Sequence, residues 1–296
     1  MIIDGKKVQL FALSANVELA KEISEYSGIP ISKCEINKFA DDEIGLNIEQ
    51  SVRGNHIFVV QPTNNPVNEH LMELLIMIDA LKRASATSVT ILMPYFGYSR
   101  QDRKAKSRQP ITAKLVADLI QTAGANRVIC IDLHAAQVQG FFDIPIDNFP
   151  AAPLLASYFN KRYLDDLIVV SPDHGGVTRA RSFARLFDVP IAIIDKRRPA
   201  PNQAEVINVI GDVTDKTCIL FDDIIDTGGT LIAGAEALLK RGAKKVLAAA
   251  THAVFSRGAM EKLEASKISK IVITNTLYPE KIKESKKFVV LSISQL

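Results

Sequence analysis

The segment that most restricts how this chain can fold is 217–242, which reads TCILFDDIIDTGGTLIAGAEALLKRG. Its apolar run 218–221 is typical of a strand buried inside a sheet, and two carboxylates follow that run directly. Residues 226–230 then predict a tight turn, which opens an Ala- and Leu-rich helix that ends at Gly242. A buried strand that leads through a polar turn into a helix is the basic unit of an α/β fold.

The polar residues of this segment are suited to binding a sugar phosphate. Asp222 and Asp223 can accept hydrogen bonds from vicinal hydroxyl groups. Backbone N–H groups at a helix start can hold a phosphate dianion, and glycine permits close approach and positive φ. The residues of the predicted phosphate turn are Asp226, Thr227, Gly228, Gly229 and Thr230. The alternative is an ordinary strand–helix turn, although such turns rarely combine three Asp, two Thr and two Gly in nine residues.

Strand-like and helical segments alternate along the chain. The clearest helix is predicted over 65–84, where leucine and isoleucine recur at helical spacing. Further helices are predicted over 16–26, 110–123, 151–163 and 177–187, and strands over 8–13, 45–48, 56–61, 89–93, 127–133, 167–171 and 191–194. This alternation predicts mainly parallel sheets with helices on both faces.

A repeated pattern indicates two similar halves. Gly124 and Ala125 lie between a predicted helix and a strand that leads to His134, and Gly242 and His252 repeat that spacing. Such junctions also occur by chance in α/β proteins, so duplication and coincidence both remain open. With duplication, the predicted domains are residues 1–148 and 149–296.

Composition excludes several classes of protein. The net charge of +3 is too small to favour nucleic acid or an anionic membrane surface as a partner, and no apolar run is long enough to span a membrane. The first residues, MIIDGKK, do not resemble a signal peptide. Cys34, Cys130 and Cys218 lie in apolar runs and predict reduced thiols in a cytoplasmic protein.

A second polar cluster follows the predicted strand 89–93. The chain has no P-loop, Rossmann or protein-kinase signature, so a bound nucleotide must be held by other residues. Arg100 and Gln101 follow a strand end, where α/β sheets place ligands, and an arginine there can stack on a base or bind a phosphate. Lys104 and Lys106 are better explained as parts of a solvated loop.

Two further strand ends carry possible metal ligands. His134 and Asp173 could each bind a hard cation such as Mg²⁺, which takes one or two protein ligands beside water and phosphate oxygens. Either residue alone is also explained as a hydrogen-bonded strand-end side chain. Residues 195–199 (DKRRP) precede PAPNQAE and predict a mobile cationic lid that neutralises a transferring phosphoryl group, or else a charged surface turn.

Taken together, these motifs resemble those of the ribose-phosphate diphosphokinase (phosphoribosyl pyrophosphate synthetase) family from about Val8 to the end of the chain. The resemblance rests on PYFGYSRQDR, DLHAAQVQGFFDIP, SPDHGGVTRAR, IIDKRRP and DDIIDTGGT, which occur in the family's order. It implies two tandem domains of phosphoribosyltransferase type, and it implies that ATP and ribose 5-phosphate are converted to phosphoribosyl pyrophosphate and AMP.

The resemblance also implies roles for particular residues. Lys196 and Arg198 would stabilise the transition state, His134 and Asp173 would bind Mg²⁺, and Asp222, Asp223 and the turn 226–230 would bind ribose 5-phosphate, with Arg198. ATP would lie against Arg100 and Gln101 and against a segment from a neighbouring subunit that holds Phe39, Asp41, Asp42 and Glu43. The implied assembly is a homodimer that builds a hexamer in the cytoplasm, without nucleic acid or membrane as a partner.

Two departures from the family pattern affect these expectations. Asp42 stands where the family usually has glycine, which adds negative charge near the nucleotide and removes freedom for positive φ. Relatives usually continue beyond the equivalent of Leu296 into a regulatory region. We therefore expect catalysis to survive, and activation by phosphate and inhibition by ADP to be affected.

Two other functions remain open. A phosphoribosyltransferase shares the D-D-x-x-D-T-G-G-T pattern, but it needs one such domain and a base-binding region. A regulatory homologue that lacks catalysis would be expected to have altered catalytic positions, whereas Lys196, Arg198, His134, Asp173 and Asp222 are all present.

Overall fold

The computed structural model describes residues 1–160, 166–197, 206–278, 282 and 284–296. They form two compact units, one of Met1–Pro150 with Ser292–Leu296 and one of Ala151–Leu291. The division between the units lies two residues beyond the predicted domain boundary, and the last five residues belong to the first unit. The origin of the two units by duplication remains a prediction.

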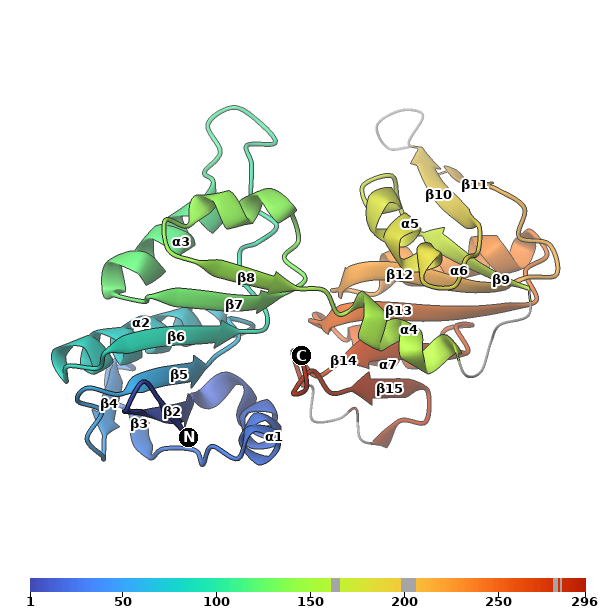
Figure 1. Cartoon of the computed structure of the whole chain (residues 1–296). Helices are drawn as coiled ribbons and strands as arrows, with labels where there is room; N and C mark the ends of the chain where they lie inside the picture. Colours follow the sequence, from blue (N-terminus) through green and yellow to red (C-terminus); the bar gives the residue numbers. More distant parts are fainter. Residues whose placement is uncertain (161–165, 198–205, 279–281, 283) are drawn as a thin grey trace. The chain divides into compact units, whose positions relative to one another are not determined.

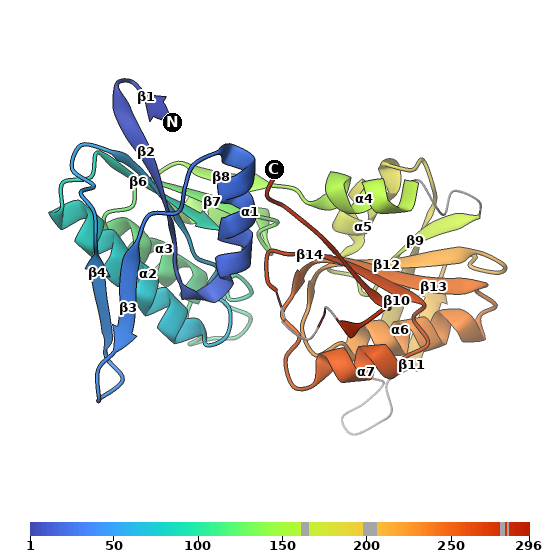
Figure 2. The same ribbon diagram turned by 90° about the horizontal axis from the view of Figure 1, so that it is seen from below.

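The first unit contains a six-stranded sheet with helices on both faces (Figures 1 and 2). Its strand order is β1 (Ile2–Ile3), β2 (Lys6–Ala12), β5 (His56–Val60), β6 (Ser88–Met93), β7 (Arg127–Ile131) and β8 (Ile146–Phe149). Neighbouring strands are parallel apart from β1 and β2. Helices α2 (Val67–Arg83) and α3 (Thr112–Ala123) share one core cluster, whereas Ala20 of α1 (Val17–Ser27) packs with Val8 and Leu10 in another.

The helices of this unit begin and end within two residues of their predicted bounds. The Asn16 side chain accepts a hydrogen bond from the Leu19 N–H at 3.1 Å and so caps α1, which Gly28 ends with φ of +69°. Leu74, Ile78 and Leu81 of α2 are completely buried, which confirms the apolar face predicted from their spacing. Short 3₁₀ turns, η1 (Ser14–Asn16) and η2 (Ala136–Phe141), complete the connections.

The last residues of the chain pack on this unit. The Ser292 hydroxyl donates a hydrogen bond to the Glu22 carboxylate of α1. Ile293 and Leu296 line an apolar cavity of about 260 Å³, together with Ile131 and Phe149 at the ends of β7 and β8. These contacts explain why residues 292–296 group with the first unit.

A two-stranded hairpin, β3 (Cys34–Lys38) and β4 (Ile44–Ile48), forms a separate small sheet in the first unit. Its tip carries the acidic residues that the sequence predicted between two strands. Phe39 is 58% exposed there. Asp42 has a φ of +67° and donates its N–H to the Phe39 carbonyl at 3.0 Å. The tip therefore demands the left-handed backbone that glycine adopts without strain, as the comparison with the family pattern implied.

The second unit contains a seven-stranded sheet that is parallel apart from one edge pair. Its strand order is β11 (Val206–Ile210), β10 (Ile191–Arg197), β9 (Leu167–Ser171), β12 (Thr217–Ile225), β13 (Lys245–Ala253), β14 (Lys270–Thr274) and β15 (Phe288–Leu291). Helices α6 (Gly229–Lys240) and α7 (Ala259–Ala265) contribute Leu231, Leu238 and Leu263 to one core cluster.

The other two helices of the second unit, α4 (Ala152–Asn160) and α5 (Val177–Arg185), are joined by aromatic contacts. Phe183 of α5 stacks on Phe221 of β12, with ring centroids 3.9 Å apart, and Phe159 of α4 meets Phe183 edge to face. All three rings are almost completely buried. Both units thus confirm the predicted α/β fold with mainly parallel sheets flanked by helices. No helix in the described parts of the chain has the length and apolarity needed to cross a bilayer.

Two strands continue beyond their predicted ends, whereas β7 stops at Ile131, two residues before its predicted end, because Asp132 has a positive φ of +41°. Asp222 and Asp223 lie inside β12, because its parallel pairing with β13 continues through Ile225. Strand β10 extends beyond the predicted end at 194, because it pairs with β11, an antiparallel strand that the apolar pattern did not reveal. In both cases the strand continues through polar residues, which a search for apolar runs leaves out.

The hairpin tip allows a direct test of backbone strain. We expect Asp42→Gly to stabilise the closed hairpin by about 0.5 kcal/mol, because glycine removes the steric cost of positive φ but adds entropy to the open state. Hydrogen exchange of the Asp42 amide reports this free energy of opening. Asp41→Gly is the matched control: Asp41 does not have positive φ, and its side chain accepts the Glu43 N–H at 3.3 Å, so its replacement should only destabilise the tip. Equal gains in both variants would contradict the assignment of strain to Asp42.

Candidate active site

The second unit has a topological switch point between β9 and β12. From β9 the chain crosses to β10 on one side, whereas β12 lies on the other side and leads away through β13. Ligands of open α/β sheets bind outside the carboxyl ends of strands at such points, because the connecting loops diverge there. The loop 172–176 follows β9 and the turn 226–228 follows β12, so the predicted metal ligand Asp173 and the predicted phosphate turn lie at this edge.

An arginine of α5 contacts the two carboxylates inside β12. Nη1 of Arg179, on α5, lies 2.8 Å from Oδ1 of Asp222 and 2.9 Å from Oδ1 of Asp223. Asp223 is 3% exposed, and its backbone N–H donates to Oδ1 of Asp222 at 2.9 Å. Arg179 was not among the residues predicted from sequence, although it lies in the motif SPDHGGVTRAR. The only signal in the sequence was a cation in the helix that follows a predicted ligand loop.

The surroundings of Asp222 disfavour its charged form. The pKa of Asp222 is raised to about 7, mainly by burial and also by the side-chain hydrogen bond and negative charge of Asp223, against the lowering effects of Arg179 and of the Asp223 N–H. The two carboxylates therefore compete for one cation in a poorly solvated place. A strongly shifted carboxyl pKa of this kind is typical of functional sites.

The turn after β12 is built to expose backbone N–H groups. Gly228 has φ of +76°, and a Cβ there would lie 3.0 Å from a carbon of Leu263, so both conformation and space favour glycine. Thr227, Gly229 and Thr230 are exposed at the start of the 12-residue helix α6, whose first N–H groups have no partner within the helix. The Ser256 N–H donates to the Asp226 carbonyl at 3.0 Å and anchors the turn.

The loop after β9 holds Asp173 in a defined orientation. Oδ1 of Asp173 accepts the Gly176 N–H at 2.8 Å, and the Ser171 hydroxyl donates to the Asp173 carbonyl at 2.7 Å. Next to it, Nε2 of His174 lies 2.7 Å from Oδ1 of Asp195, a buried residue of β10. The loop is therefore tied to β10, the strand that contains the backbone of Lys196.

In the first unit, two of the predicted ligand segments share one sheet edge. Arg100 and Gln101 follow β6 and His134 follows β7, the neighbouring parallel strand. The Thr112 hydroxyl of α3 donates to the Gln101 carboxamide at 2.6 Å. The Gln137 side chain donates to Asp102 at 2.6 Å, so the loop with Arg100 is joined to the turn that follows His134.

The other predicted nucleotide residues lie on the hairpin. Phe39, Asp41, Asp42 and Glu43 are all exposed at its tip. A pocket of about 730 Å³ between the hairpin and α2 is lined in part by Asp42, Glu43 and Glu69, and Glu69 forms an ion pair of 2.7 Å with Lys38. The tip thus presents acidic and aromatic groups outward.

The predicted metal and lid residues are only partly described. His134 belongs to the first unit and Asp173 to the second. Within the described residues there is no cluster of three or more His, Cys, Asp or Glu side chains that could hold a metal ion. Arg198 lies outside the described residues, as does the side chain of Lys196. Their predicted roles remain predictions.

Comparison with known proteins identifies the family. A model of the N-terminal domain of ribose phosphate pyrophosphokinase matches residues 8–124, and the phosphoribosyl synthetase-associated domain matches residues 197–296. Ribose-phosphate pyrophosphokinase of Bacillus caldolyticus is 59% identical over 290 residues, which cover 98% of this chain and 92% of that protein. The Bacillus subtilis protein of that name is 54% identical over 291 residues, with the same coverage. The chain belongs to the ribose-phosphate pyrophosphokinase family.

A solved structure of the family agrees with the fold. The crystal structure of phosphoribosylpyrophosphate synthetase from Mycobacterium smegmatis matches with a TM-score of 0.93 and 44% sequence identity, and the match covers 98% of this chain and 96% of that chain. Both units of this chain, including the hairpin and the switch point, therefore have the architecture of a pyrophosphokinase.

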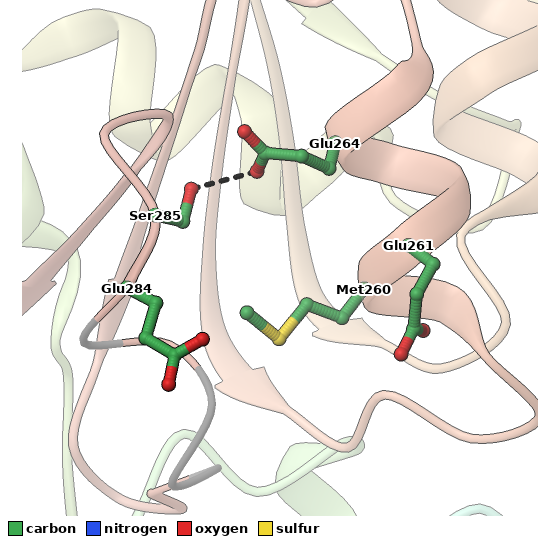
Figure 3. A pocket seen from close by; sticks show the side chains of 5 residues that line it. All are labelled: Met260, Glu261, Glu264, Glu284 and Ser285. Carbon is green, nitrogen blue, oxygen red and sulfur yellow. Dashed lines mark hydrogen bonds between the residues drawn. The ribbon is translucent and has the colours of Figure 1, made fainter.

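A pocket on the second unit lies outside the residues that the family pattern assigns. It has a volume of about 290 Å³ and is lined by Met260, Glu261, Glu264, Glu284 and Ser285 (Figure 3). The Ser285 hydroxyl donates to Glu264 at 2.6 Å. Three carboxylates around one small pocket would repel a phosphorylated ligand. The pyrophosphokinase substrates are therefore not expected there.

The raised pKa of Asp222 predicts how stability depends on pH. In the unfolded chain this carboxyl ionises near pH 4, whereas in the folded chain it ionises near 7, so folded stability falls as pH rises between these values. Asp222→Asn cannot ionise. We therefore expect the variant to melt at least ~2 °C above wild type at pH 8 and to lose this advantage at pH 4.5, measured by calorimetry.

Asp212→Asn serves as the control of opposite sign. The Thr214 N–H donates a hydrogen bond to Asp212 at 3.0 Å and lowers the pKa of that carboxyl. The charged form of Asp212 therefore stabilises the fold at pH values above the pKa that this carboxyl has in the unfolded chain. This variant should be less stable than wild type at pH 8. A gain for Asp212→Asn, or a pH-independent effect of Asp222→Asn, would contradict the assignment.

Proposed function

We propose that this protein synthesises phosphoribosyl pyrophosphate. It transfers the diphosphoryl group of ATP to the anomeric hydroxyl of ribose 5-phosphate and releases AMP, which supplies nucleotide biosynthesis. The observation that supports this most directly is the acid pair Asp222 and Asp223, which lies next to an exposed anion-binding turn at the switch point. Membership of the pyrophosphokinase family supports the same reaction.

The sugar half of the site consists of residues in the second unit. Asp222 and Asp223 accept hydrogen bonds from the ribose hydroxyls, and the backbone of 226–230 binds the 5-phosphate. The exposure of Thr227, Gly229 and Thr230 supports this role, because a phosphate must reach their N–H groups without displacing other side chains. Arg198 adds a contact to the sugar phosphate.

The nucleotide half uses residues of the first unit. Arg100 and Gln101 bind ATP, together with Phe39, Asp41, Asp42 and Glu43 from the hairpin of a neighbouring subunit. The 58% exposure of Phe39 supports this arrangement, since an aromatic ring at a hairpin tip is suited to contact outside its own unit. The protein accordingly assembles as homodimers that form a hexamer.

Mg²⁺ is the metal that best suits the donor groups. The exposed carboxylate of Asp173 is already oriented by the Gly176 N–H. His134 follows β7 of the first unit. One or two protein ligands beside phosphate oxygens are typical of Mg²⁺. Bound Mg²⁺ would neutralise charge on the ATP phosphates.

The reaction needs no covalent intermediate with the protein. The anomeric oxygen forms a bond to the β-phosphorus and loses its proton, while the bond from that phosphorus to the α–β bridging oxygen breaks and AMP leaves with the electron pair. The contribution of the protein is positioning and charge neutralisation. Lys196 and Arg198 stabilise the charge that develops on the transferring group. The cytoplasm is the expected location, and the three free cysteines are consistent with a reducing compartment.

One assay separates this function from its alternatives. Purified protein incubated with ATP, Mg²⁺ and ribose 5-phosphate should release AMP without any nucleobase, and omission of ribose 5-phosphate should abolish that release. A phosphoribosyltransferase would require a nucleobase, and a regulatory homologue would bind nucleotide without turnover. Repeating the assay with and without inorganic phosphate shows whether phosphate activates the enzyme.

The role of Lys196 predicts a defect in turnover. We expect Lys196→Ala to lower kcat by at least ~10²-fold while the fold is retained, because a preorganised cation for the transition state is lost. Lys104→Ala is the matched control, since Lys104 is exposed and has no assigned role. Near-normal turnover of Lys196→Ala, or an equal loss in both variants, would contradict the assignment; circular dichroism checks the fold.

A further inference from the structure

We infer that Arg179 is a positioning residue that orients Asp222 and Asp223 for the hydroxyls of ribose 5-phosphate. This inference rests on the proposed function, because it concerns the sugar half of that site. It adds a residue outside the strand and turn that form the sugar site: Arg179 lies on α5, on the other side of the sheet switch point.

Arg179 contacts both acids at once, and we call this three-residue contact of Arg179, Asp222 and Asp223 the clamp. A single guanidinium nitrogen, Nη1, lies within 2.9 Å of one oxygen of each carboxylate. Each carboxylate has two oxygens and about four lone-pair sites, so this contact uses one oxygen of each and leaves further acceptor capacity. Because the Asp223 N–H also donates to Oδ1 of Asp222, that oxygen is fixed by two donors. The orientation of the acid pair is thus determined before a sugar binds.

The charge balance at the clamp also favours hydroxyl recognition. Two adjacent carboxylates inside a buried strand tend to retain a proton, and a protonated carboxyl loses part of its acceptor capacity. Arg179 lowers the pKa of Asp222 and so opposes the effects of burial and of Asp223. Charge-assisted contacts of this kind are stronger than neutral hydrogen bonds.

The packing of α5 gives the clamp a rigid base. Four residues after Arg179, Phe183 stacks on Phe221 with centroids 3.9 Å apart and planes 3° from parallel. Phe221 directly precedes Asp222 on β12. Ala180, next to Arg179, is completely buried. The helix that carries the cation and the strand that carries the acids are therefore held in register by a buried aromatic pair, which limits the movement of the clamp.

Steady-state kinetics of three variants test this role. Arg179→Gln should raise KM for ribose 5-phosphate at least ~10-fold, with KM for ATP changed less than ~2-fold, because only the sugar contacts lose their orientation. Arg179→Lys should recover part of that loss, since the observed contact needs one cationic nitrogen. Arg181→Gln on the same helix is the matched control: Arg181 is exposed and should have wild-type constants.

A double-mutant cycle with Asp222→Asn shows whether Arg179 acts through the acid pair. If it does, Arg179→Gln should raise KM for ribose 5-phosphate by a much smaller factor in the Asp222→Asn background than in wild type, because the effects of coupled residues are not additive. Additive effects, an unchanged KM for ribose 5-phosphate, or equal defects in Gln and Lys variants would overturn the inference. Failure of the wild-type protein to release AMP would overturn the proposed function and this inference together, whereas a wild-type-like Arg179→Gln in an active protein overturns the inference alone.

Discussion

The second unit depends on keeping two adjacent carboxylates together inside a buried parallel strand. Asp222 and Asp223 would repel each other and lose hydration there, which costs free energy unless cations and N–H donors compensate. Arg179 supplies this compensation, because the switch point places α5 beside β12 and its guanidinium contacts both carboxylates. Three further features lie at the same edge of the sheet: the aromatic packing of α5, the glycine turn 226–230 and the loop that contains Asp173. Under the proposed function, this edge of the second unit binds ribose 5-phosphate.

The first unit, to which we assign the nucleotide, is also built on a mainly parallel sheet. Its sheet also collects polar groups at the ends of neighbouring parallel strands, but the groups are an arginine, an amide and an imidazole rather than an acid pair. Cationic and amide groups suit a base and phosphates, whereas acids suit hydroxyls. The hairpin extends outward with Phe39 exposed, which fits a contribution to another subunit. Under the proposed function, the first unit recognises the nucleotide with cationic and amide groups, and the second recognises the sugar with an acid pair.

The sequence predicted most of the elements because their signals are local. Helix caps, apolar spacing and glycine turns depend on neighbouring residues, and Asn16, Gly28 and the face of α2 agreed with prediction. The errors concern features that depend on distant partners. β12 continues through its acids because β13 pairs with it, and Arg179 reaches residues 43 positions away. No local pattern contains that information. The family pattern supplied one further correct expectation, a position at Asp42 that requires positive φ.

A crystal structure of the protein with ribose 5-phosphate tests the central claim most directly. We predict that the ribose hydroxyls donate hydrogen bonds to Asp222 and Asp223 and that Arg179 keeps its contact with both acids. The phosphate oxygens should accept hydrogen bonds from the N–H groups of 226–230. Electron density for the sugar phosphate at another place, or an acid pair that turns away from bound sugar, would contradict it.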